Sequence, residues 1–208
     1  MAGDQGASQP SLPAGDCAWP QARLDYRHCD FTGIRLEGAD LKRADLQGCD
    51  LSRADLREAD LFHANLDRTT LDRAILRRAN LFGANLKQAS IRDADLTWAY
   101  LKDASLEQSD LSHSRLDHGF MLRAVLIDSK LIGASLKTLI LTGAALEQAD
   151  LSGADLSGSM LNGATLTDAR CEKARLTGTL FHNARPEGAD FSGALDIPAQ
   201  LQTRMPDN

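Results

Sequence analysis

The chain contains 208 residues and carries a formal net charge of −6, from 29 acidic and 23 basic side chains. Only 5% of its residues are aromatic and 43% are hydrophobic, so a buried core has to be aliphatic and rich in small side chains. No stretch reaches the roughly 18–20 apolar residues of a membrane span, and four scattered cysteines exclude a disulfide-built scaffold. With no secretory signal pattern and only mild acidity, we expect a cytoplasmic protein that neither enters a membrane nor binds nucleic acid directly.

The N-terminal segment, residues 1–23, is rich in proline and glycine, a composition that predicts a disordered tail. Three large side chains, Trp19, Leu24 and Tyr26, lie near its end and just after it. We expect them to fold over the beginning of the domain that follows, because the open end of a repeat domain needs a cover.

Residues 24–194 form a five-residue repeat. Its central residue, called i below, falls at every fifth position from Phe31 to Phe191, which makes 33 repeats without an insertion. Leucine occupies i in 26 repeats, alanine occupies i−2 in 22, and 12 of the 16 glycines lie at i+2. Residues 29–193 contain 44 charged side chains, and none of them is at i or i−2. Because burying an unpaired charge is very costly, these two columns are predicted to face a common dry interior.

The repeat predicts a coiled β-structure. Two inward residues with an outward one between them alternate as in a strand, and the remaining two residues form a turn. An α-helix, with its period of 3.6, cannot hold this five-residue register. Apolar residues in the outward i−1 column recur every 20 residues, at Tyr100, Phe120, Ile140, Met160 and Leu180. This recurrence indicates four repeats per coil and a rod of about eight coils, about 40 Å long at ~4.8 Å per coil.

The segments Ala39-Asp40-Leu41 and Ala54-Asp55-Leu56 show the A(D/N)LXX pattern, in which the chain resembles the pentapeptide-repeat proteins over about 165 residues. The resemblance implies an all-β fold, a right-handed quadrilateral β-helix with the i leucines stacked in its core. For the quinolone-resistance branch of that family it further implies a DNA mimic that dimerises through its C-terminal end. Such a mimic binds DNA gyrase and topoisomerase IV and protects them from inhibitors, which gives antibiotic resistance. The arginine-rich N-terminal half departs from that branch, since mimicry needs a dominant negative potential.

Residues 195–208 follow the last repeat and are predicted to cap the C-terminal end. Pro198 is expected to open a short helix that docks Leu201 inward, with Leu195 and Ile197 nearby. The final residues, 205–208, are expected to fray.

No constellation of side chains points to catalysis, and we expect neither an enzyme nor a bound cofactor or metal. His113 and His118 lie close in sequence to Ser112 and Asp117, but solvated turn residues are the favoured interpretation because every repeat displays such side chains. There is no phosphate-binding loop, dinucleotide motif or C-x-x-C zinc pattern.

The cysteines are interpreted from their place in the repeat. Cys29 and Cys49 both occupy i−2 one coil apart, a spacing that permits a disulfide, although buried thiols are favoured in a reducing cytoplasm. Cys171 replaces a core leucine and is expected to be inert.

Two outward surfaces are candidate sites. The first, called the apolar stripe below, consists of Phe62, Phe82, Trp98, Tyr100, Phe120, Leu122, Ile140, Met160 and Leu180. A contiguous stripe of this length is typical of an interaction surface, which predicts a non-enzymatic protein–protein interaction module that forms a homodimer or binds another protein. Coverage of the stripe by the chain's own N-terminal tail is the alternative.

The second surface, called the acidic face below, lies around Leu46 and the i residues that follow it at intervals of 20. Its seven acidic side chains are Asp45, Asp67, Glu107, Asp128, Glu147, Asp168 and Glu187. A solvated face explains them as well as a docking role does.

Overall fold

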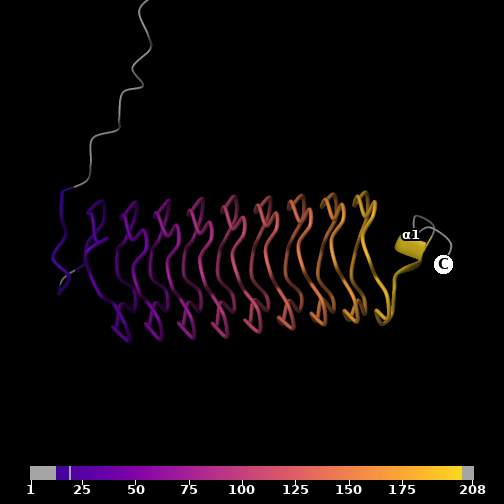
Figure 1. The fold of residues 1–208 in the computed structure, drawn as a ribbon, viewed down its shortest axis with the longest axis horizontal. Coiled ribbons are helices and arrows are strands. Elements are labelled where there is room, and N and C mark those ends of the chain that lie inside the picture. Colours follow the sequence, from indigo (N-terminus) through magenta and orange to yellow (C-terminus); the bar gives the residue numbers. More distant parts are fainter. Residues whose placement is uncertain (1–12, 19, 203–208) are drawn as a thin grey trace, which may run out of the picture.

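The computed structural model describes residues 13–18 and 20–202, which wind into a rod of stacked coils (Figure 1). Each i−1 residue from Asp25 to Arg175 forms a one-residue parallel bridge with the residue 20 positions further along, as Asp40 does with Asp60. The bridges confirm that four repeats complete one coil. The fold is therefore an all-β, four-sided solenoid in which each strand is reduced to its bridging residue.

The interior of the rod is formed by the two predicted columns. Every i residue from Phe31 to Phe191 is buried, and so is every i−2 residue except Ile34, Ala39 and Ala189 near the ends. Polar residues at i−2 are satisfied by backbone carbonyls: Ser109 donates to Leu106 at 2.7 Å. The exclusion of charge from these columns thus predicted the core correctly, because a dry aliphatic interior accepts only groups whose hydrogen bonds are made locally.

Backbone hydrogen bonds join the coils in one pattern that recurs along the rod. The N–H groups at i−1, i and i+2 donate to carbonyls of adjacent coils, as Leu61 does to Asn80 at 2.8 Å. The N–H at i−2 closes a turn onto the preceding i carbonyl, as Ala64 does onto Leu61 at 2.9 Å. Only the N–H at i+1 is left without a backbone acceptor in this pattern.

An aspartate or asparagine at i−1 supplies the missing acceptor. Its side-chain oxygen accepts the N–H two residues on: Asp60 from Phe62 at 3.2 Å, Asp110 from Ser112 at 3.0 Å and Asn80 from Phe82 at 3.2 Å. This is the Asx turn that favours these two residue types. The frequent Asp or Asn before the central leucine of this chain therefore has a structural cause, which does not require recognition of a partner.

Replacing Asp110 with alanine is expected to lower the free energy of unfolding by about 1 kcal/mol, because the part-buried Ser112 N–H loses its acceptor. Asp110→Asn should retain most of that stability, since asparagine makes the same bond at Asn80 and Asn85. Urea unfolding followed by circular dichroism measures both variants. Equal losses in the two variants would contradict a capping role.

The second turn residue, i+2, has a left-handed backbone. Its φ lies between +52° and +73°, whether the residue is glycine or carries a side chain, as in Trp98. Glycine is free of the Cβ clash that other residues meet in this conformation. This explains why 12 of the 16 glycines occupy the i+2 column.

The C-terminal cap is the one predicted from sequence. Helix α1, Ala199–Gln202, follows Pro198, whose carbonyl accepts the Leu201 N–H at 2.9 Å. Leu201 is buried, and α1 lies at the C-terminal end of the rod (Figure 1). Residues 203–208 are outside the described residues. Within the described ranges no helix combines the length and hydropathy needed to cross a membrane.

The N-terminal end agrees with the prediction in that Leu24 and Tyr26 pack against the core, but it differs in the segment before them. Ala14 forms a parallel bridge with Asp25, and the Gly15 N–H donates to the Asp25 carbonyl at 2.8 Å. The ring of Tyr26 is buried and lies against Gly15. Where it is described, the predicted tail of residues 1–23 is thus paired with the first coil. The N–H and C=O groups at the N-terminal edge of that coil need hydrogen-bond partners, and the tail supplies them. The prediction for residues 1–12 and Trp19 lies outside the described residues.

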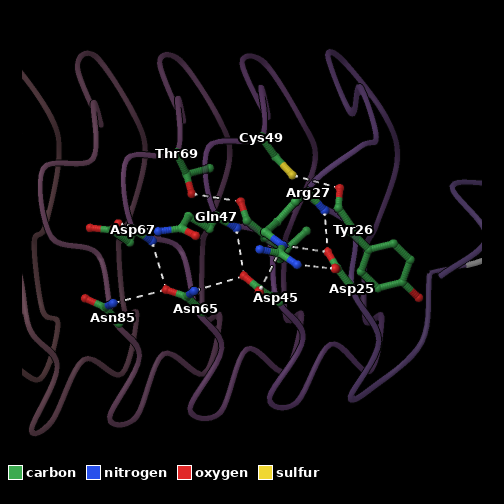
Figure 2. Close-up of polar contacts among 11 residues, drawn as sticks. Asp25, Tyr26, Arg27, Asp45, Gln47, Cys49, Asn65, Asp67, Thr69 and Asn85 are labelled. Carbon is green, nitrogen blue, oxygen red and sulfur yellow. Dashed lines mark hydrogen bonds and ion pairs between the residues drawn. The ribbon is translucent and has the colours of Figure 1, made fainter. Parts of the chain in front are cut away.

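The cysteines also pair differently. Cys29 is bonded to Cys17, so both the predicted buried thiol at Cys29 and the alternative bridge to Cys49 are wrong. Cys49 is a free, buried thiol that donates to the Tyr26 carbonyl at 3.1 Å (Figure 2), and burial raises its pKa to about 11. Burial likewise raises the pKa of Cys171 to about 12, in agreement with the inert thiol expected there.

Candidate interaction surfaces

The central part of the apolar stripe is one column of outward-facing bridged residues. Tyr100, Phe120, Ile140, Met160 and Leu180 are joined in sequence by parallel bridges, so they stack on consecutive coils of a single side. Four of them keep 37–43% of their surface exposed, and Ile140 is half-buried. This arrangement is what the 20-residue recurrence predicted.

Aromatic rings extend the stripe toward the N-terminus. The rings of Phe62 and Phe82 stack with centroids 5.4 Å apart, and Phe82 stacks on Tyr100 at 6.1 Å. Tyr100 in turn lies 6.0 Å from Phe120. These contacts form a continuous ladder whose outer surface is already ordered, so little side-chain entropy would be lost when another protein packs on it.

Trp98 and Leu122 flank this ladder. Trp98 is 47% exposed and stacks on the His118 imidazole with centroids 4.6 Å apart, while Leu122 is half-buried. An exposed tryptophan held in place by a stacked ring is the type of anchor that contributes most at protein interfaces.

The i−1 residues of the stripe cannot cap their turns as aspartate and asparagine do elsewhere. Its five bridged residues occupy i−1 positions, where Asp60 and Asn80 on the same side accept the i+1 N–H. An aromatic or aliphatic side chain cannot accept that bond, and at Leu180 the His182 N–H is accepted instead by Oδ1 of Asn162 on the preceding coil, at 2.9 Å. The stripe therefore exposes apolar surface where other turns carry a capping side chain at i−1.

Beneath the stripe the core is packed unusually. Gly119 and Leu139 replace alanine at the i−2 positions that stack on two successive coils, and Leu139 is fully buried. A Cβ on Gly119 would lie 3.1 Å from a methyl carbon of Leu139 and 3.1 Å from the Leu116 carbonyl. The glycine therefore makes the space that the leucine fills.

At its N-terminal end the acidic face is a ladder of side chains that hydrogen-bond from one coil to the next (Figure 2). Asn65 donates its amide to Asp45 at 2.9 Å, and Asn85 donates to Asn65 at 3.0 Å. The Arg27 guanidinium lies 2.6 Å from Asp25 and 3.3 Å from Asp45, and its hydrogen bond holds the pKa of Asp25 at about 2. The carboxylates at this end are thus neutralised by neighbours.

Farther along the acidic face the charges separate into two groups. Gln47 donates to Asp67 at 2.7 Å, and Lys87 lies 2.8 Å from Glu107. Within the described part of the chain no cation pairs with the remaining four, which lie toward the C-terminus: Asp128, Glu147, Asp168 and Glu187. One carboxylate oxygen each of Glu107 and Glu147 is buried without a hydrogen-bond partner.

Arginine–aspartate pairs reduce the negative potential on other sides of the rod too. Arg57 hydrogen-bonds to Asp55 at 2.6 Å and Arg123 to Asp103 at 2.8 Å, and each hydrogen bond lowers the pKa of its aspartate. At both pairs the carboxylate charge is balanced at the surface.

The Ser/His/Asp residues considered from sequence do not assemble into a relay. Asp117 accepts from the Ser135 hydroxyl at 2.6 Å and from the Lys137 N–H at 2.9 Å, and His118 contacts Thr138 at 2.5 Å. Among the described residues no hydrogen bond links Ser112 to either histidine.

Comparisons with known proteins agree with this geometry. A family model described as pentapeptide repeats matches eight copies, which together run from residue 27 to residue 170. HetL, a pentapeptide repeat protein involved in heterocyst differentiation regulation from the cyanobacterium Nostoc, is 30% identical over 81% of this chain and 92% of its own, with a TM-score of 0.31. Rfr23 from the cyanobacterium Cyanothece is 35% identical over 49% of this chain and 63% of its own, with a TM-score of 0.36.

QnrB1, a plasmid-mediated fluoroquinolone resistance protein, is 17% identical over 83% of this chain and 87% of its own, with a TM-score of 0.32. Among curated proteins no sequence match was found. The match to the repeat model, rather than these superpositions, decides the family.

Proposed function

Since the chain belongs to the pentapeptide-repeat family, we propose that it is a non-enzymatic interaction module, a rigid rod that docks a protein partner through the apolar stripe. The observation that supports this proposal is the column from Tyr100 to Leu180. There, five consecutive coils place an apolar side chain where an aspartate or asparagine would cap the turn. A local preference that is broken repeatedly along one side favours a function for that side.

The alternative function, DNA mimicry toward DNA gyrase or topoisomerase IV, depends on a long negative surface. The acidic face supports it less well, because Arg27 and Lys87 neutralise its N-terminal half. The 17% identity to QnrB1 bears on the fold alone. A gyrase supercoiling assay with and without a fluoroquinolone tests this alternative: the docking proposal expects no inhibition and no rescue.

Phe120→Asp is the variant that tests docking. It places a charge at the centre of the stripe on an already exposed position, so the rod should fold while partner binding falls by about 30-fold or more, the loss expected at an interface hot spot. Ile132→Asp is the matched control, because Ile132 is 37% exposed, against 38% for Phe120, and lies on another side of the rod.

The measurement compares wild type and both variants in two ways. Light scattering reports self-association, and quantitative pull-down from the native lysate reports other partners. The proposal expects that wild type and Ile132→Asp both form a dimer or both retain the same protein in the pull-down. Phe120→Asp is expected to lose that dimer or that bound protein. If both variants behave as wild type, the stripe is not the docking surface.

A further inference from the structure

Three potential metal ligands converge at the N-terminal end of the rod. The sulfur atoms of Cys17 and Cys29 and a ring nitrogen of His28 lie within 4.8 Å of one another. The two cysteines form a disulfide, and Nε2 of His28 is 3.6 Å from the Cys29 sulfur. Cys29 is buried, Cys17 is half-buried and His28 is exposed, so the cluster is open to solvent on one side.

The backbone holds this cluster together independently of the disulfide. Cys17 lies in the segment that pairs with the first coil, where the Asp25 N–H donates to the Pro13 carbonyl and the Gly15 N–H donates to the Asp25 carbonyl, both at 2.8 Å. The hydroxyl of buried Tyr26 donates to the Gln21 carbonyl at 3.1 Å on the other side of Cys17. Reduction of the disulfide therefore leaves both thiols near the imidazole.

We propose that Cys17, His28 and Cys29, in the dithiol form, bind a divalent metal ion of the zinc type, and that the metal and the disulfide are alternative closures of the N-terminal cap. Thiolate and imidazole are the ligands that zinc prefers, and three protein ligands leave a fourth position for water. At a tetrahedral centre with Zn–S of about 2.3 Å and Zn–N of about 2.0–2.1 Å, sulfur and nitrogen lie about 3.6 Å apart. The His28–Cys29 pair already has this separation.

The two closures exclude each other because both use the same sulfur atoms. In zinc binding the two sulfurs lie about 3.8 Å apart at a tetrahedral centre, and side-chain rotation supplies this separation from Cα atoms 5.6 Å apart. Oxidation of the metal-bound dithiolate by a small-molecule disulfide such as oxidised glutathione forms the Cys17–Cys29 bond and releases the metal ion. The glutathione disulfide is reduced to two thiolates, which take up two protons from water to give two molecules of reduced glutathione. In a reducing compartment the dithiol form, and hence the metal, is expected to prevail.

The test uses the full chain, reduced under anaerobic conditions and titrated with Co²⁺ and then with Zn²⁺. The expected result is one equivalent of Co²⁺ with a thiolate-to-cobalt charge-transfer band and the visible bands of tetrahedral cobalt, displaced by zinc. The chain oxidised with glutathione disulfide should bind neither ion. Failure of the reduced chain to bind an equivalent of either ion would overturn the proposal.

His28→Asn separates the metal from the disulfide. It removes an exposed ligand without touching either sulfur, so disulfide formation should be unchanged while zinc affinity falls at least about tenfold. Cys49→Ser is the matched control, since Cys49 is outside the cluster and should leave cobalt binding as in wild type. Wild-type zinc affinity in His28→Asn, or loss of the charge-transfer band in Cys49→Ser, contradicts the assignment.

Discussion

Replacing Leu96 with aspartate is expected to unfold the central coils of the rod and to lower the free energy of unfolding by about 5 kcal/mol or more. Leu96 is fully buried in the i column, between Leu76 and Leu116 of the adjacent coils, which are fully buried as well. Truncating a buried leucine costs about 2–5 kcal/mol, and an unpaired charge in the same place adds a further penalty. Because each coil contacts only its neighbours, the damage should begin at this coil and spread to the next ones.

Urea unfolding followed by circular dichroism measures this loss, with Leu96→Met as the matched control. Methionine keeps the volume and the apolar character, so it should cost less than about 1.5 kcal/mol. The same aspartate substitution at Leu106, which is also fully buried, should behave as at Leu96. An unchanged unfolding midpoint in either aspartate variant would contradict the inward position of the i column.

The second large effect is expected beneath the apolar stripe, at Gly119 and Leu139. Gly119→Ala introduces a Cβ that is 3.1 Å from a Leu139 methyl carbon and 3.3 Å from the Ala99 carbonyl, so we expect a loss of about 1–3 kcal/mol from overpacking. Leu139→Ala alone should cost about 2–5 kcal/mol because it leaves a cavity beside the glycine.

The double variant should cost less than the two single losses together. With alanine at both positions the column has the composition found at i−2 in most other repeats, and the new Cβ fills part of the space that the leucine leaves. A coupling free energy of about 0.5–3 kcal/mol is expected for side chains in contact. Additive losses in the thermodynamic cycle would show that the two residues do not compensate each other.

The interior of the rod was predictable from sequence because its cause is repeated in every unit. The absence of charge from two of the five columns can be seen in the sequence before the shape of the coil is known. The recurrence from Tyr100 to Leu180 then indicates how many repeats complete one coil. Pro198 and Leu201 likewise predicted α1, since proline at the start of a helix and an inward leucine are local signals.

The N-terminal cap could not be predicted in this way. Cys17 lies outside the repeat, so no periodicity relates it to Cys29, and the proline-rich composition around it is typical of disorder. The available signal was the open end of the first coil at Asp25, whose backbone groups need partners that only the preceding residues supply.

The role of the aspartates at i−1 could not be predicted from sequence either, although the sequence shows that they share one column of the repeat. A surface carboxylate at i−1 is equally compatible with solvation and with docking while the backbone bonds are unknown. Once four of the five N–H groups in a repeat are assigned to carbonyls, the fifth identifies the side chain at Asp60 or Asp110 as its acceptor. The composition of the repeat thus follows from hydrogen bonding that a sequence pattern alone does not reveal.

The bridge spacing of 20 residues restricts how this molecule can change its length. Adding or removing one whole coil keeps each downstream residue on its original side, so Phe120 and Leu180 would remain aligned. Loss of a single repeat would instead rotate everything downstream by about a quarter turn and divide the stripe between two sides. Insertions and deletions that preserve a binding surface on such a rod are therefore expected to come in multiples of four repeats.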